Sequence, residues 1–203
     1  YEYYAFTITV YSWIIPLTEG WNLISIPFVH ETGDVEEVLL DQLYECLPDE
    51  ESYAVWSYQF NGEDSEWQKA KRNGYGNLES VEPGHSYWIK IEGCENTALK
   101  GFGRKMHIPP GIPPEVDAPF NHWMMIGRYG VLGTTPGEAG ELYKDTALET
   151  LFVDDNARVL EYQWDGDFES TDYLNPYQGY WAYIIDSEHE TGTYAPDGTY
   201  WNN

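Results

Sequence analysis

Carboxylates are the most abundant reactive side chains in this sequence. The chain holds 35 Asp and Glu residues against 10 Lys and Arg, for a net charge of −25. Paired carboxylates can cleave glycosides, but pairs arise by chance in so acidic a chain, and nothing marks one as a general acid. The sequence contains no phosphate loop, dinucleotide fingerprint or nucleophile elbow. We therefore expect a protein that is not an enzyme.

Histidines offer no metal site either. The five residues His30, His85, His107, His122 and His189 are scattered, and none stands at a metal-ligand spacing.

Two acidic turns have the oxygen-rich character that calcium prefers. Each follows an Asn-Gly or Asp-Gly dipeptide, and neither has the glycine position or terminal glutamate of an EF-hand. The candidate ligands are Asp64, Glu66, Asp165, Asp167 and Glu169. The alternative is a plain acidic hairpin tip, and no other cofactor is expected.

Aromatic residues are more numerous than a core of this size needs, with nine Trp and 18 Tyr in 203 residues. Planar rings near the predicted hairpins could stack on sugars, and the candidates are Trp56, Trp67, Trp164 and Tyr173. The alternative places these rings in a core or an interface.

Charge and cysteine content restrict the environment and the partners. The acidic surface repels nucleic acid and anionic lipid, and no apolar run reaches the roughly 18 residues of a membrane span. A chain that starts at Tyr1 suggests an exported form from which a leader has been removed. Cys46 and Cys94, the only cysteines, are then either a disulfide or two buried thiols.

The elements that must position these residues occur twice along the chain. Tyr58-Gln59-Phe60-Asn61-Gly62 recurs as Tyr162-Gln163-Trp164-Asp165-Gly166. Pro83-Gly84-His85-Ser86-Tyr87-Trp88 is echoed by Pro176-Tyr177-Gln178-Gly179-Tyr180-Trp181. A weaker match joins the segment that starts at Gly20 to the one that starts at Asn121. Matched blocks in the same order indicate an internal duplication.

Each copy is predicted to contain strands and one short helix. Strands are expected at WNLISIPF, AVWSYQF and SYWIKIE, and again at HWMMIGRY, RVLEYQW and GYWAYII. The apolar residues of VEEVLLDQL share one helical face, and ELYKDTALETLF is the expected counterpart in the second copy. The fold class is therefore mainly β, with two tandem sandwich-like or barrel-like modules that each carry a short helix.

A terminal strand precedes the repeat in this interpretation. The predicted divisions are a strand over residues 1–15, a first module over 16–104, a Pro-rich linker over 105–118 and a second module over 119–203. Apolar side chains project from one face of the strand, at Tyr4, Phe6, Ile8, Val10 and Ile14. Such a strand would aggregate unless it paired within its own chain or with another.

The motifs GWNLISIPF, VWSYQFNG and PGHSYWIKIEG resemble the repeat that begins with Gly-Trp-Asn and ends with Gly-Tyr-Trp in exported archaeal and bacterial surface proteins. Surface-layer-like proteins and cell-wall adhesins carry this repeat. The resemblance covers about residues 18–103 well and 119–186 loosely; the second copy has Asn121-His122-Trp123 at its start, and the first has Ser86 before Tyr-Trp. It implies an extracellular β-rich module and no activity.

Two functions are consistent with these features. The first is an extracellular structural subunit that self-assembles into a filament or surface layer by donating its N-terminal strand to a neighbouring copy. The alternative is a monomeric cell-surface adhesion or carbohydrate-binding module. Expected partners are accordingly other copies of the chain or surface glycans, with no nucleic acid and no membrane span.

Overall fold

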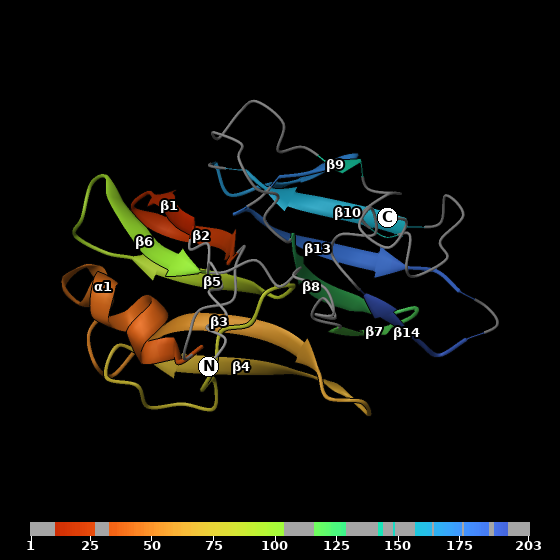
Figure 1. Ribbon diagram of the computed structural model, residues 1–203, viewed down its shortest axis with the longest axis horizontal. Coiled ribbons are helices and arrows are strands. Elements are labelled where there is room, and N and C mark those ends of the chain that lie inside the picture. Colours follow the sequence, from red (N-terminus) through yellow and green to blue (C-terminus); the bar gives the residue numbers. More distant parts are fainter. Residues whose placement is uncertain are drawn as a thin grey trace, which may run out of the picture.

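The computed structural model of the chain is mainly β. It describes residues 11–26, 33–103, 116–128, 142–143, 148, 157–163, 165–175, 177–186 and 189–194. Two four-stranded antiparallel sheets lie at its centre (Figure 1). No helix among the described residues is long and apolar enough to cross a membrane.

The N-terminal half is built on the sheet β2-β5-β3-β4, whose strands are Gly20–Ser25, Ser86–Ile91, Tyr53–Phe60 and Ser65–Lys71. The antiparallel pair of β1 (Tyr11–Leu17) and β6 (Thr97–Gly103) covers one face of this sheet. A short helix lies on the same core, with α1 (Asp41–Leu43) between a π-helical turn, η1 (Glu36–Leu40), and a 3₁₀ turn, η2 (Tyr44–Cys46). Its inward residues are buried, as the apolar spacing predicts: Val35, Val38, Leu39 and Leu43.

The C-terminal half repeats this topology. Its sheet is β8-β13-β10-β11, with strands Trp123–Gly127, Gly179–Ile184, Ala157–Tyr162 and Phe168–Ser170. The register is also equivalent: Leu23 pairs with Trp88 in the first sheet, and Met125 with Trp181 in the second. The strands predicted at the repeated motifs are therefore present. Each half buries its own apolar cluster, so the described residues form two cores.

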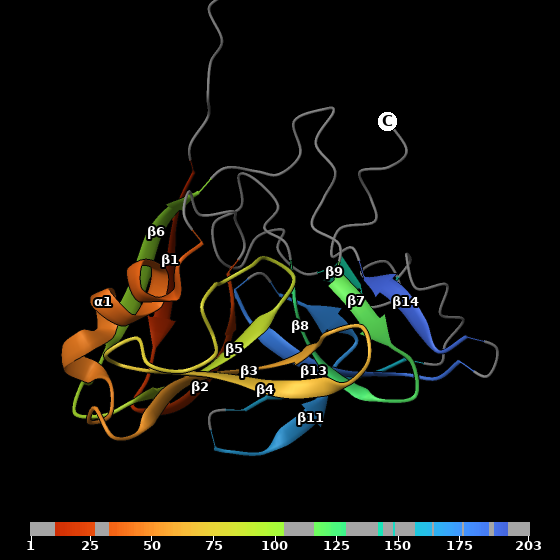
Figure 2. The same cartoon turned by 90° about the horizontal axis from the view of Figure 1, so that it is seen from below.

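The two-stranded pairs at the ends of the molecule correct the prediction for the N-terminal strand. In the C-terminal half, β7 (Val116–Pro119) pairs with β14 (Thr191–Tyr194) as β1 pairs with β6 (Figure 2). Residues 11–15 thus belong to the repeat, and β7 begins inside the range 105–118 expected as a linker. The reason is that the inward face of β1 is the odd one, where three side chains enter the core: Trp13, Ile15 and Leu17.

The second helix is also corrected where the structure describes it. Leu142 and Tyr143 of the predicted helix form β9 (Leu142–Tyr143), an extended segment that pairs with β12 (Tyr173–Leu174). Helices are therefore found only in the N-terminal half of the described residues. Most of ELYKDTALETLF lies outside them.

The two halves approach each other closely at four small residues, Ser25, Ser86, Gly127 and Gly179. A Cβ added to Gly127 would lie 2.4 Å from the Ser25 Cβ and 2.3 Å from the His85 carbonyl oxygen. A Cβ on Gly179 would lie 2.7 Å from the Ser86 Oγ. The absence of side chains at these glycines is what permits the sheets to cross so closely.

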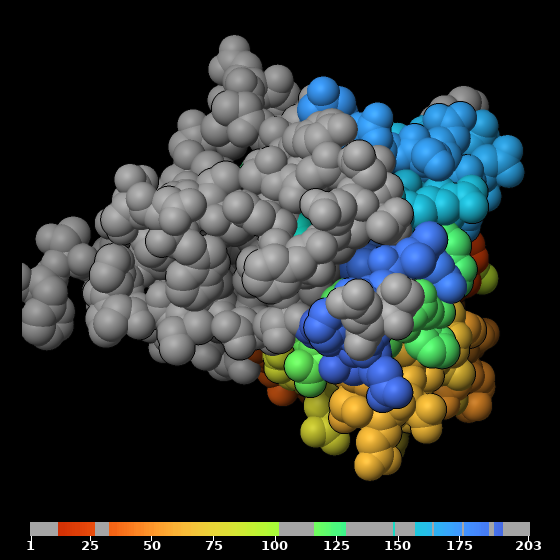
Figure 3. Space-filling view, turned by 90° about the vertical axis from the view of Figure 1, so that its right-hand side faces the viewer, coloured from red at the N-terminus to blue at the C-terminus, as the bar shows by residue number. Residues whose placement is uncertain are grey.

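Equivalent hydrogen bonds join the halves at this crossing. The Ser25 N–H donates to the Tyr177 carbonyl (2.9 Å), and the Gly127 N–H donates to the Gly84 carbonyl (2.7 Å). The Ser86 hydroxyl also donates to the Ile126 carbonyl. Further out, β3 lies beside β7, and gold and green surfaces adjoin in Figure 3. The halves are related as the two subunits of a two-fold dimer would be.

Candidate functional site: an aromatic layer

A continuous set of aromatic rings covers the outer faces of both central sheets. We call it the aromatic layer. Neighbouring ring centroids lie 4.7–6.4 Å apart, mostly edge to face, the geometry that aromatic pairs prefer. Its members are Trp21, Tyr53, Trp56, Tyr58, Trp67, Trp88, Trp123, Tyr162, Phe168, Trp181 and Tyr183.

Strand alternation explains why the layer forms. In each Tyr-Trp motif the Tyr points into the core and the Trp points out, because neighbouring side chains of a strand face opposite ways. Tyr87 and Tyr180 are fully buried. Trp88 and Trp181 lie at equivalent places in the layer.

Ring contacts in one half recur in the other. Tyr162 packs on Trp88 at 4.7 Å, and its equivalent Tyr58 packs on Trp181 at 5.6 Å. Each of these pairs joins a ring of one half to a ring of the other. The layer therefore depends on how the halves are arranged and not on either sheet alone.

Two cavities open between these rings. The N-side cavity, of about 260 Å³, is lined by Trp21, Trp56, Trp67, Trp88 and Tyr162. The C-side cavity, of about 400 Å³, is lined by Tyr58, Trp67, Trp123, Leu160, Phe168 and Trp181. Each takes one tyrosine from the opposite half, and Trp67 lines both.

The rings are accessible as well as packed. Trp21 and Trp67 are each 37% exposed, and Phe168 is 43% exposed. Exposed apolar surface of this extent, gathered in one place, is characteristic of binding sites. The cavities are lined almost wholly by rings, so the chemistry that they offer is stacking rather than acid–base catalysis.

Cations lie at the edge of the N-side cavity. The Lys69 Nζ is 5.1 Å from the Trp56 ring centroid, and the Lys90 Nζ is 5.9 Å from that of Trp21. Lys69 and Lys71 also approach the Tyr53 ring, each at 5.5 Å. Ammonium groups at such distances are attracted by the negative faces of the rings.

The pKa shifts beside the layer belong to two buried tyrosines and one partly buried histidine. Burial raises the pKa of Tyr87 and Tyr180 far above the ordinary value for a phenol. Burial also lowers the pKa of His85, against the smaller opposing effect of Glu82. These tyrosines and this histidine are neutral at pH 7 and support the strands and the crossing.

The predicted aromatic candidates have different outcomes. Trp56 and Trp67 lie in the layer. Tyr173, 48% exposed on β12, lines neither cavity, and Trp164 lies outside the described residues. Most of the layer was not predicted from the sequence, including the Trp of each Tyr-Trp motif. That Trp follows a core Tyr on a strand, and this alternation predicts that it faces outward.

The predicted calcium ligands do not converge within the described residues. No group of three or more His, Cys, Asp or Glu side chains there is placed to hold a metal. Asp64, Glu66, Asp165, Asp167 and Glu169 are all exposed. The first turn is closed by the Asn61 Oδ1, which accepts the Glu63 and Asp64 N–H groups, and the second by the Asp165 Oδ1, which accepts that of Asp167.

The candidate assembly strand is described only in part. Tyr4, Phe6, Ile8 and Val10 lie outside the described residues. Ile14 lies on β1 with 56% of its surface exposed, on the face turned away from the core.

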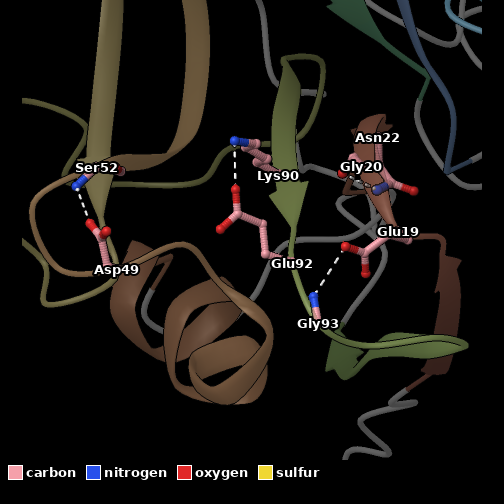
Figure 4. Close-up of polar contacts among 8 residues, drawn as sticks. All are labelled: Glu19, Gly20, Asn22, Asp49, Ser52, Lys90, Glu92 and Gly93. Atoms are coloured by element: carbon pink, nitrogen blue, oxygen red, sulfur yellow. Dashed lines mark hydrogen bonds and ion pairs between the residues drawn. The ribbon is translucent and has the colours of Figure 1, made fainter.

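Cys46 and Cys94 are bonded to each other, with Cα atoms 5.4 Å apart. The disulfide ties η2 to the loop after β5. The Glu19 carboxylate fixes the same loop by accepting the N–H groups of Gly93 and Cys94, each at 3.1 Å; Figure 4 shows the bond to Gly93.

Comparison of the chain with protein-family models, with curated proteins and with solved structures finds no match.

Proposed function

We propose that this protein is a cell-surface adhesion module that binds carbohydrate through the aromatic layer. The observation that carries the proposal is the pair of equivalent ring-lined cavities that share Trp67. Flat pyranose rings present apolar faces that stack on Trp and Tyr, and a continuous layer offers successive stacking sites to one chain. No catalytic role is assigned to it.

The wider architecture supports an exported protein. The two halves are tandem β-sandwich modules in this proposal, and the disulfide favours an oxidising compartment. The net charge of −25 keeps such a module soluble outside the cell and away from nucleic acid. The resemblance to Gly-Trp-Asn surface repeats points to the same location.

Trp67→Ala provides the test. Trp67 lies on the edge strand β4 and lines both cavities, so its loss should weaken binding at either one by about tenfold or more. Binding would be measured on a glycan array and then by titration with the best oligosaccharides. Tyr75→Ala is the matched control, because Tyr75 is 74% exposed and lines neither cavity.

The proposal would be contradicted if Trp67→Ala bound glycans as tightly as the unmodified chain. It would also be contradicted if the unmodified chain bound none of the glycans tested. Circular dichroism of the variant distinguishes lost binding from lost folding.

Self-assembly into a filament or surface layer is the second candidate. The observation that favours it is the outward, exposed Ile14 on β1, the strand that directly follows residues 1–10 in the sequence. Donation of those residues to a neighbouring copy would form a head-to-tail, open assembly.

Removal of residues 1–10 tests this candidate without touching Trp13, which is buried in the core. The full chain should form large particles by light scattering and electron microscopy, and the shortened chain should stay monomeric. A full chain that is itself monomeric, or assemblies that persist after truncation, would rule out strand donation.

A further inference from the structure

We propose that the N-side cavity selects acidic sugars, with Lys69 and Lys71 contacting the carboxylate of a uronate unit while its ring stacks on the tryptophans. This inference rests on the proposed function and adds the class of ligand.

The first support is the segregation of charge across β4. Trp67, Lys69 and Lys71 share the face of the layer, because Tyr58 pairs with Trp67, Trp56 with Lys69 and Tyr53 with Lys71. Glu66 and Gln68 alternate with them and face the other way. Because Asp and Glu far outnumber Lys and Arg in this chain, an exposed strand face is expected to be acidic. The face of β4 beside the cavity is instead cationic.

The second support is the distribution of cations over the molecule. The structure describes seven Lys and Arg residues, namely Lys69, Lys71, Arg72, Lys90, Lys100, Arg128 and Arg158. Four of them lie on the face of the aromatic layer: Lys69, Lys71, Lys90 and, paired with Tyr183, Arg158. More than half of the described Lys and Arg residues therefore lie on this one surface, although the chain has few of them.

The third support is a difference between the cavities. Ser170 and Tyr183 stand in the C-terminal sheet where Lys69 and Lys90 stand in the N-terminal one, as the strand registers show. Trp56 is likewise replaced by Leu160. Each cavity is lined by five rings, but the N-side cavity combines its rings with neighbouring ammonium groups, and the C-side cavity is the less charged of the two.

Lys69 and Lys71 are better candidates for the ligand than Lys90. The Lys90 Nζ lies 2.6 Å from a Glu92 carboxylate oxygen, so its charge is already paired within the chain (Figure 4). The side chains of Lys69 and Lys71 are held over the rings of Tyr53 and Trp56. Because these side chains are already held in place, less conformational entropy is lost when they contact a stacked sugar.

The test compares oligomers of galacturonate, alginate and hyaluronan with their carboxyl-reduced forms, which keep the same backbone without the charge. Titration calorimetry should show tighter binding of at least one carboxylated oligomer than of its reduced form. The Lys69→Gln/Lys71→Gln variant should lose roughly three- to tenfold in affinity for that oligomer, with little change for the reduced one. Lys100→Gln on β6 is the control and should bind like the unmodified chain.

Each outcome separates this inference from the proposed function. Equal binding of both forms, or a double variant that keeps its preference for carboxylates, overturns the inference while stacking by the aromatic layer still stands. Binding only of neutral glycans on the array has the same meaning. Binding of no glycan of either kind overturns both.

Discussion

The Tyr-Trp motif divides its two rings between the two faces of a strand. The Tyr87 hydroxyl lies in the core, where it accepts the Glu82 N–H at 2.8 Å. The Tyr180 hydroxyl accepts the Asn175 N–H at 2.5 Å in the same way. Both bonds close the loop that leads into the strand, so each tyrosine also holds the bend at which the halves meet.

Removal of either hydroxyl should therefore destabilise the protein. Tyr87→Phe and Tyr180→Phe each leave a backbone N–H without its partner, at a cost of about 1 kcal/mol. Equilibrium unfolding in urea would measure this, with Tyr75→Phe as the control because Tyr75 is largely exposed. Two variants that unfold like the unmodified chain would show that the hydroxyls contribute nothing.

His85 makes stability depend on pH at the same bend. Burial lowers its folded-state pKa below the value near 6.5 of an unfolded chain, so the unfolded state binds the proton first as pH falls. The contribution of neutral His85 to the free energy of unfolding is therefore fully present above pH 6.5. It is lost as the pH falls from 6.5 to the folded-state pKa. We expect the melting temperature to fall less between pH 7 and 5 in His85→Gln than in the unmodified chain.

His122→Gln serves as the control for this pH series, since His122 lies on the exposed turn before β8. Equal slopes for the unmodified chain and His85→Gln would contradict the assignment.

At the scale of elements, one disulfide joins the helix to the sheet of the N-terminal half. Cys46 and Cys94 are 48 residues apart in sequence, and closing a loop of that length stabilises the fold by about 4 kcal/mol in the chain-entropy model. The short helix depends on this connection and on its buried face, because α1 alone spans only Asp41–Leu43.

Cys46→Ser/Cys94→Ser should lower the free energy of unfolding by that amount. Reductant should lower the melting temperature of the unmodified chain to that of the double variant and leave the variant unchanged. A melting temperature insensitive to reductant would mean that the bond adds no stability.

Much of the sheet architecture could be predicted from sequence, because the repeated strands alternate inward and outward residues between clear turn dipeptides. The inward face of the N-terminal strand could not, since both faces of YEYYAFTITVYSWII carry apolar residues. In β1 the buried side chains are those of the odd residues Trp13, Ile15 and Leu17. The aromatic layer could not be predicted from the sequence either. It forms where Tyr58 and Tyr162 cross to the opposite half, and that crossing depends on small residues with no periodic pattern.

At the scale of the whole molecule, the two halves behave as subunits of a dimer within one chain. Their contact rests on close backbone approach at the crossing, with the aromatic layer on its flanks. Equivalent hydrogen bonds from Ser25 and Gly127 fix the angle between the sheets. The proposed binding across the layer would therefore require that the crossing be intact, even though no residue of the crossing lines either cavity.

Gly127→Ala tests this dependence directly. The new methyl group would lie 2.3 Å from the His85 carbonyl oxygen, so the halves must shift apart at a cost of about 1–3 kcal/mol. The near-UV circular dichroism of the layer should weaken, since Tyr58 and Trp181 belong to different halves. Gly62→Ala is the control: no atom lies within 4 Å of its added Cβ, so it strains only a hairpin turn and should leave the near-UV signal unchanged. An unaltered near-UV spectrum and melting temperature in Gly127→Ala would mean that the layer does not depend on this crossing.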